Sequence, residues 1–310
     1  MSAKTGFLAW STKKKILIFS AVGLVLVALG VGLGVGLGVG LKDHDDGDDE
    51  GDTTESNGAV NKTVKWQPAV GTKWQIELLY PLNDTSVDAE VYDIDLFNNK
   101  ASVISDLQKK GRKVICYFSA GTYEDWRSDA GDFHKADLGD ELPDWPGERW
   151  LNIKSSSVRK IMQTRLDLAQ KKGCDGVDPD NIDAYDNKNG LHLTKADSIN
   201  FVNWLASEAH TRGLSMGLKN GGDIIDSVIS NLQWCVNEQC AQYEECDTYA
   251  AFTKANKPVF QIEYPKGDDV NDNKSVTAKQ KSGACNADSA GNFSTVIKNM
   301  NLDSWVEYCS

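Results

Sequence analysis

The sequence predicts an α/β fold, a (β/α)8 TIM barrel preceded by an N-terminal transmembrane helix and a disordered acidic linker. Short apolar runs alternate with helix-like segments, and eight such runs fit within about 240 residues of one barrel domain. A parallel sheet is expected because parallel neighbours need a long crossover, which a helix supplies. A closed barrel is favoured over an open dinucleotide-binding sheet because the sequence has no Gly-x-Gly-x-x-Gly turn.

The N-terminal part of the chain predicts a membrane anchor. Lys13–Lys15 precede an uncharged run, Ile16–Leu41, which is long enough to span about 30 Å of bilayer hydrocarbon. A cleaved signal peptide is the alternative, but the run exceeds the usual apolar region of about 7–15 residues and lacks an Ala-x-Ala site. We therefore expect a cytoplasmic tail at 1–15, a transmembrane anchor at 16–41, an acidic disordered linker at 42–62 and the barrel domain at 63–310.

The lysines before the apolar run should stay in the cytoplasm, so the domain should lie outside it. We expect a single-pass type II protein of the cell membrane with an extracellular domain, and release to the cell wall or secretion is the alternative. All seven cysteines follow the run, so several should form disulfides and at least one should be free; Cys240 and Cys246 are expected to close a loop. Four glycosylation sequons agree with this topology: Asn61, Asn83, Asn273 and Asn292.

Composition excludes some classes of function. The net charge of −12 excludes a general affinity for nucleic acid, which requires a basic surface. The four histidines are scattered and no Cys/His set has zinc-site spacing, so we expect neither a metal nor another cofactor. We also expect a monomer.

The predicted strands are short apolar runs bounded by polar or turn-forming residues. They are Trp74–Tyr80, Val91–Phe97, Lys113–Ser119, Gly176–Asp180, Leu214–Lys219, Trp234–Glu238, Val259–Tyr264 and Trp305–Tyr308. The predicted helices carry apolar residues at three- and four-residue spacing, and a glycine ends the longest ones. They are Ala101–Lys110, Ser156–Lys172, Thr194–Arg212, Ile224–Asn231 and Asp247–Ala255.

In such a barrel the active site lies at the carboxyl ends of the strands, and polar residues gather there in this sequence. Asp178 and Asp180 share one face of their strand because side chains alternate. An Asx-rich turn and a calcium loop are the alternatives for this stretch. The active-site interpretation is favoured because the other strands also end in polar side chains: Asp93 and Asp95, Tyr117 and Ser119, Lys219 and Asn220, Glu238, Glu263 and Tyr264, and Glu307 and Tyr308.

Converging carboxylates with aromatic residues, and without a metal triad or a Ser/His pair, indicate glycoside hydrolysis. This reaction needs one carboxylate as nucleophile or base and a second that donates a proton. We predict a retaining reaction with Asp180 as the nucleophile and Glu238 as the general acid and then the general base. Glu238 follows a largely apolar strand, which is expected to raise its pKa. An ordinary surface glutamate is the alternative.

A further set of residues is predicted to bind the substrate. It consists of Trp74, Asp93, Asp95, Tyr117, Asp178, Lys219, Asn220, Glu263, Tyr264 and Glu307. Aromatic side chains form sugar platforms in such sites, and Trp126 and Tyr185 are additional candidates. Core packing is the alternative for each aromatic residue.

Several motifs occur in order between Trp66 and Cys309. They include Trp74-Gln75-Ile76, Val91-Tyr92-Asp93-Ile94-Asp95, Val114-Ile115-Cys116-Tyr117-Phe118-Ser119-Ala120-Gly121, Gly173-Cys174-Asp175-Gly176-Val177-Asp178-Pro179-Asp180-Asn181, Leu218-Lys219-Asn220 and Asn237-Glu238-Gln239-Cys240. Together they resemble glycoside hydrolase family 114. The resemblance implies an endo-α-1,4-polygalactosaminidase on a TIM barrel, with Asp180 and Glu238 at the positions of the proposed catalytic pair. The anchored layout is similar to that of fungal members that act on galactosaminogalactan.

The resemblance implies a cationic galactosamine-containing polysaccharide as the partner. Deacetylated galactosamine carries ammonium groups, which acids at the strand ends would bind: Asp93, Asp95, Asp178, Glu263 and Glu307. Two alternatives stay open, an α-galactosidase-like hydrolase that acts on neutral galactosides and a non-catalytic polysaccharide-binding module.

Overall fold

The computed structural model describes residues 66–309. Residues 1–65, and with them the predicted tail at 1–15, anchor at 16–41 and linker at 42–62, therefore lie outside the described part. Within residues 66–309, no helix combines the length and apolar character needed to cross a bilayer.

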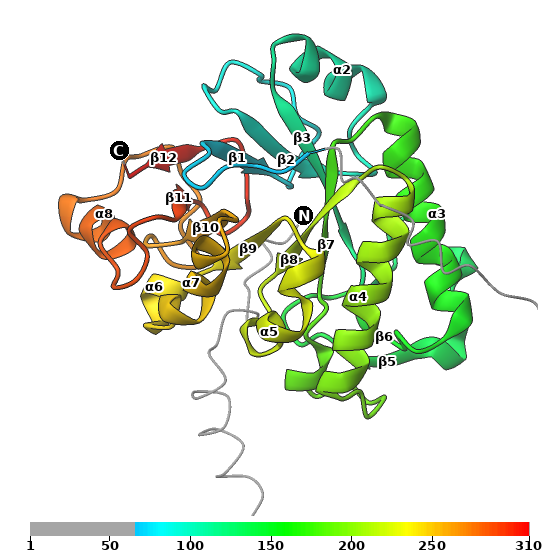
Figure 1. Cartoon of the computed structure of the whole chain (residues 1–310). Helices are drawn as coiled ribbons and strands as arrows, with labels where there is room; N and C mark the ends of the chain where they lie inside the picture. Colours follow the sequence, from blue (N-terminus) through cyan, green and yellow to red (C-terminus); the bar gives the residue numbers. More distant parts are fainter. Residues whose placement is uncertain (1–65, 310) are drawn as a thin grey trace, which may run out of the picture. The chain divides into compact units, whose positions relative to one another are not determined.

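A nine-stranded sheet forms a nearly closed barrel (Figure 1). Its order is β1-β2-β3-β7-β8-β9-β10-β11-β12, and all neighbours are parallel except β11 and β12. The first and last parts of the sheet meet, since β1 contacts β11. The strands are β1 (Trp74–Glu77), β2 (Val91–Asp95), β3 (Lys113–Ser119), β7 (Gly176–Asp180), β8 (Ser215–Lys219), β9 (Trp234–Glu238), β10 (Val259–Glu263), β11 (Ser294–Lys298) and β12 (Val306–Tyr308).

The eighth barrel strand differs from the prediction. We expected Trp305–Tyr308, but the eighth parallel strand is β11, and β12 runs antiparallel beside it. The sequence did not predict β11 because this strand, Ser-Thr-Val-Ile-Lys, has only two apolar residues. Side chains tie this region to β1: the Trp74 indole N–H donates to the Ser294 carbonyl at 2.7 Å, and the Tyr308 hydroxyl donates to the Trp74 carbonyl at 3.0 Å.

The long helices agree with the predicted ones. Gly111, Gly173 and Gly213 follow three of them with φ of 80°, 86° and 71°, a left-handed conformation that suits glycine. Two short helices, α6 and α8, were not predicted. The helices are α2 (Ala101–Lys109), α3 (Ser156–Lys172), α4 (Lys195–Thr211), α5 (Ile225–Val228), α6 (Cys240–Tyr243), α7 (Cys246–Lys254) and α8 (Ala278–Cys285).

A small antiparallel sheet, also not predicted, is inserted between β3 and α3. Its order is β4-β6-β5, and its strands are β4 (Thr122–Glu124), β5 (Leu138–Glu141) and β6 (Glu148–Leu151). Because it begins directly after β3, this sheet lies at the carboxyl end of the barrel, where the predicted site is.

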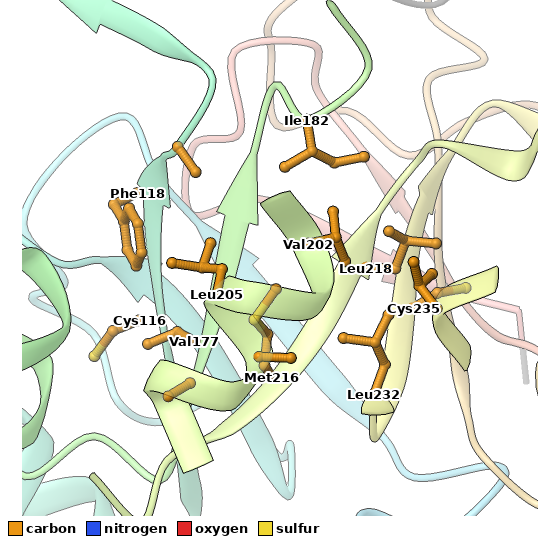
Figure 2. Packing of buried hydrophobic residues seen from close by; sticks show 14 of the residues in the cluster. Cys116, Phe118, Val177, Ile182, Val202, Leu205, Met216, Leu218, Leu232 and Cys235 are labelled. Atoms are coloured by element: carbon orange, nitrogen blue, oxygen red, sulfur yellow. The ribbon is translucent and has the colours of Figure 1, made fainter. Parts of the chain in front are cut away.

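Alternate residues of the strands face opposite sides, which gives two cores. Outside the barrel, side chains of β3, β7, β8 and β9 pack toward α4, as Figure 2 shows: Cys116, Phe118, Val177, Met216, Leu218 and Cys235 with Val202 and Leu205. Inside the barrel lies a second cluster that includes Trp74, Ile76, Val91, Ile115, Trp234, Val236, Phe260 and Ile262.

Glycines on two neighbouring strands make room for the interior Trp234. A Cβ at Gly217 would lie 2.0 Å from Trp234 Nε1, and a Cβ at Gly176 would lie 2.5 Å from Trp234 Cη2. The indole therefore fills the barrel interior below the inward-facing residues that follow on β7 and β8.

Three disulfides confirm the prediction that most cysteines pair. They join Cys116 to Cys174, Cys240 to Cys246 and Cys285 to Cys309. The predicted Cys240–Cys246 loop is present, and Cys235 is a buried free cysteine.

Candidate active site

Asp180 and Glu238 lie on either side of a single buried lysine. They end β7 and β9, and β8 between these strands ends in Lys219. The Lys219 Nζ lies 3.2 Å from Asp180 Oδ2 and 3.0 Å from Glu238 Oε2. The two carboxylate side chains are 15% and 19% exposed, whereas the lysine is 3% exposed. The acids are thus open to a ligand, and their counter-charge is held beneath them.

Hydroxyl and amide groups orient the two acids further. Tyr117 donates a hydrogen bond to Asp180 Oδ2 at 2.9 Å, and Tyr264 donates to Glu238 Oε1 at 2.6 Å. The Asn220 amide donates to Glu238 Oε2 at 3.0 Å, and its carbonyl accepts from the Glu238 main-chain N–H at 2.9 Å. The structure therefore brings together four residues of the predicted binding set around the predicted catalytic pair.

The residue after each of these three strands has a left-handed backbone. Asn181, Asn220 and Gln239 have φ of 60°, 50° and 63°. Such a conformation costs non-glycine residues about 1–2 kcal/mol, with Asn among the most tolerant. Asparagine directly after a strand-end acid or lysine, as at Asn181 and Asn220, is the sequence signal that could have identified two of these three sharp turns at the strand ends.

The exit after β7 is also held by a close backbone approach. The Ala120 and Gly121 N–H groups donate to the Asp180 carbonyl at 2.8 and 3.1 Å. A Cβ at Gly121 would lie 1.7 Å from the Asn181 carbonyl oxygen, so a side chain there would displace the loop. This turn fixes the main chain that carries Asp180.

The electrostatics of the site differ from the prediction for Glu238. Burial alone would raise its pKa, but the Lys219 ammonium and the hydrogen bonds from Tyr264 and Asn220 outweigh burial and hold the pKa below its usual value. The prediction of a raised pKa for Glu238 is therefore wrong. It was based on the apolar residues of the same strand, which do not reveal that Lys219 lies at the end of the next strand. Burial likewise disfavours charge on Lys219, but the surrounding carboxylates reverse this effect and raise its pKa.

Two residues of the predicted binding set lie away from this group. Trp74 is fully buried because it begins β1, at the amino end of the barrel, and its ring packs on Phe260. Asp95 ends β2 but is ion-paired to Arg127, with 2.8 Å between Oδ2 and Nη1, and it is 2% exposed.

Two predicted acids near the C-terminal strands have structural partners. Glu263 accepts from the Ala241 main-chain N–H at 2.8 Å, and burial raises its pKa to about 7. Glu307 lies on β12, 3.5 Å from the Lys281 ammonium. It is on β12 rather than on a parallel strand because the eighth barrel strand is β11.

The remaining predicted acids, Asp93 and Asp178, lie inside the barrel below Asp180 and Glu238, the predicted catalytic pair. Both are 0% exposed, so neither contacts a ligand at the mouth in this conformation. Of the two additional platform candidates, Trp126 is 44% exposed, whereas Tyr185 is half-buried beneath the Lys195 ammonium. Within residues 66–309 no group of His, Cys, Asp and Glu side chains has the arrangement of a metal site.

Comparison with known proteins identifies the family and the fold of the chain. The model of glycoside-hydrolase family GH114 matches residues 55–310. The crystal structure of Aspergillus fumigatus Ega3 in complex with galactosamine is 70% identical, with a TM-score of 0.79, and the match covers 80% of this chain and 98% of that chain. The glycoside hydrolase domain of PelA from Pseudomonas aeruginosa shares the fold, with a TM-score of 0.56 and 13% identity over 76% of this chain and 98% of that chain.

One curated protein is also similar in sequence. An uncharacterized protein of Deinococcus radiodurans is 28% identical over 177 residues, which are 50% of this chain and 57% of that protein. The matched region therefore spans little more than half of that relative.

Proposed function

The chain belongs to glycoside hydrolase family GH114 and is a glycoside hydrolase, and from this premise we propose that it cleaves α-1,4-linked galactosamine within a cationic polysaccharide. The observation that carries the proposal is the pair of partly exposed acids, Asp180 and Glu238, held by one buried ammonium. The substrate class is supported by Ega3, a 70% identical protein whose structure contains galactosamine.

The geometry suits a double displacement. Asp180 Oδ forms a bond to the anomeric carbon as the glycosidic bond breaks, and Glu238 gives its proton to the departing oxygen. Glu238 then takes a proton from water, whose hydroxyl attacks the anomeric carbon and releases Asp180. The lowered pKa of Glu238 keeps this carboxylate ionised, which is the form that accepts the proton from water in the second step.

The spacing of the acids supports retention of configuration. Asp180 Oδ2 and Glu238 Oε2 bind the same nitrogen at 3.2 and 3.0 Å, so these oxygens are no farther apart than the sum of the two distances. That sum is below about 6.5 Å, the lower end of the separation in inverting enzymes.

Product analysis tests the substrate. The purified full-length protein is incubated with deacetylated galactosaminogalactan, with the acetylated polymer and with neutral α-galactosides, and the products are sized. We expect internal cleavage of the deacetylated polymer, weakened by salt that screens charges beyond about 8 Å at physiological strength. Equal cleavage of the acetylated polymer contradicts recognition of ammonium groups. Cleavage of galactosides alone favours the α-galactosidase alternative, and binding without turnover favours the binding module.

We also propose a type II membrane location, with residues 16–41 as the anchor and the domain outside. Three sequon asparagines, Asn83, Asn273 and Asn292, are exposed, as glycosylation requires. Fractionation and glycosidase treatment of the native protein test this location, and a dominant soluble form without residues 1–41 would contradict it. A monomeric state stays a prediction that light scattering would check.

A further inference from the structure

A second pair of acids lies directly below the catalytic pair. Asp93 on β2 and Asp178 on β7 each come two residues before a strand-end acid and share its inward face. The strand β3 separates β2 from β7, and alternate strands of a barrel contribute side chains to the same interior layer. The two carboxyl groups interact with each other inside the barrel, and both are 0% exposed.

The pair receives no hydrogen bond from a donor elsewhere in the described chain. In residues 66–309, no main-chain or side-chain donor reaches any of the four carboxyl oxygens of Asp93 and Asp178. Their side chains instead form a hydrogen bond with each other. Two ionised carboxylates have no hydrogen to share, so this bond exists only when at least one of them is protonated.

Electrostatics favour the same protonated pair. Burial is the largest effect on both groups, and it raises the pKa of Asp178 to about 7 and the pKa of Asp93 well above its ordinary value. Repulsion from neighbouring carboxylates adds to burial, and Lys219 opposes it. The charged or titratable groups that act on the pair are Asp180 on β7, Lys219 on β8, and Glu238 and Cys235 on β9.

Lys219 shows which acids hold its ammonium. Its Nζ lies 3.2 Å from Asp180 and 3.0 Å from Glu238, the upper acids. Within residues 66–309 it forms no ion pair with the lower acids, Asp93 and Asp178, although it attracts both electrostatically. If Asp93 and Asp178 were both ionised, they would be two buried carboxylates that receive no hydrogen bond. They would then compete strongly with Asp180 and Glu238 for the Lys219 ammonium. A proton on the lower pair removes half of that competition.

We propose that Asp93 and Asp178 share a proton during turnover and act as positioning residues, leaving the Lys219 ammonium to Asp180 and Glu238. This proposal deepens the proposed hydrolysis and rests on it for its kinetic consequence. The pair does not touch the substrate. It acts by keeping the lysine in the place where it orients both catalytic carboxylates.

Infrared spectroscopy tests the shared proton independently of activity. The full-length protein near neutral pH should show the carbonyl stretch of a buried protonated carboxyl, and the difference spectrum against Asp93→Asn should show its loss. Asp95→Asn is the matched control, since Asp95 lies two residues along the same face and is ion-paired with Arg127. No loss in Asp93→Asn, or an equal loss in the control, overturns the proposal.

Kinetics test the positioning role. An asparagine amide supplies the hydrogen that the shared proton supplied, so Asp93→Asn should keep kcat within about tenfold, an effect of one net hydrogen bond. Asp93→Ala leaves Asp178 without a partner, so its kcat should fall at least tenfold below that of Asp93→Asn while KM changes little. Asp178→Asn gives a second isosteric variant if the alanine protein does not fold. Inactivity of both asparagine variants as complete as that of Asp180→Asn overturns the proposal.

The pH profile separates positioning from mere packing. With an aryl galactosaminide whose leaving group needs no proton from Glu238, wild-type kcat should fall at alkaline pH as the pair loses its last proton and attracts Lys219. In Asp93→Asn only Asp178 can ionise, so positions 93 and 178 cannot carry two charges and the alkaline fall in kcat should move to higher pH. A fall in kcat at the same pH as in wild type overturns the proposal. If wild type cleaves neither galactosaminide nor polymer, the proposed hydrolysis fails, while the infrared result still decides the shared proton.

Discussion

Asp180 and Asp178 are the same residue type two positions apart on β7, yet their environments are opposite. Asp180 receives a tyrosine hydroxyl and a lysine ammonium and is partly exposed. Asp178, two residues earlier on the same face of β7, is fully buried, and among residues 66–309 it interacts with Asp93 but receives no hydrogen bond from another donor. The comparison teaches that strand position brings carboxylates together, whereas the donors around them decide which can act as charged catalysts.

The largest expected effect on turnover distinguishes Asp180 from Asp178. Asp180→Asn removes the nucleophile, so kcat on the polymer should fall by about 10⁴-fold or more. Polymer binding and the far-UV circular dichroism spectrum should stay close to wild type. Asp178→Asn is the control and should keep measurable turnover. An active Asp180→Asn protein with an inactive Asp178→Asn protein would mean that the lower acid is the nucleophile.

Removing the shared cation should destabilise the upper pair. Lys219→Met leaves two largely buried carboxylates without their counter-charge, which costs up to about 3–5 kcal/mol in free energy of unfolding. Because the pKa of Lys219 is raised, its contribution is complete below about pH 10 and is lost only as the pH rises through the folded-state value. Urea unfolding at neutral pH measures the difference.

A surface ion pair provides the control for this change. Lys113 lies 2.7 Å from Asp175 but is 45% exposed, so Lys113→Met should cost less than about 1 kcal/mol. Equal losses for the two variants would show that Lys219 is not held by a buried charge network.

The raised pKa of Asp178 should affect how the stability of the protein depends on pH. The pKa of Asp178 is raised to about 7, so its contribution is complete below the unfolded value near 4 and is lost as the pH rises through about 7. Asp178→Asn does not titrate, so its free energy of unfolding should improve relative to wild type by a few kcal/mol between acid and alkaline pH. Parallel stability curves for the two proteins would contradict a protonated Asp178.

The smallest effect concerns the hydrogen bond from Tyr264 to Glu238. This bond lowers the pKa of Glu238, so Tyr264→Phe should raise it. The basic limb of kcat/KM on the polymer should move to higher pH, because Glu238 keeps its proton longer. Turnover at the optimum should change by about tenfold or less, the size of one net hydrogen bond. A shift to lower pH would reverse the assigned role of the hydroxyl.

Residue patterns close in the sequence predicted much of this architecture. The apolar spacing and terminal glycine of Ser156–Lys172 give the observed helix, because a helix depends on neighbours three and four residues away. Alternation placed Asp178 and Asp180 on one face of a strand. The same reasoning failed for the eighth strand, where β11 has few apolar residues and is defined by its pairing with β10.

The sequence by itself determined the long helices, seven of the eight parallel barrel strands, the acids at the strand ends and the candidate pair Asp180 and Glu238, because these follow from local periodicity and residue type. Tertiary structure alone decided which acids face the mouth, how the cysteines other than Cys240 and Cys246 pair, and that Lys219 lies between Asp180 and Glu238. The physical reason is that burial and charge pairing depend on side chains from strands far apart in sequence. A strand that ends in acid can therefore present a partly exposed carboxylate, as β7 does, or a buried carboxylate neutralised by an arginine, as β2 does.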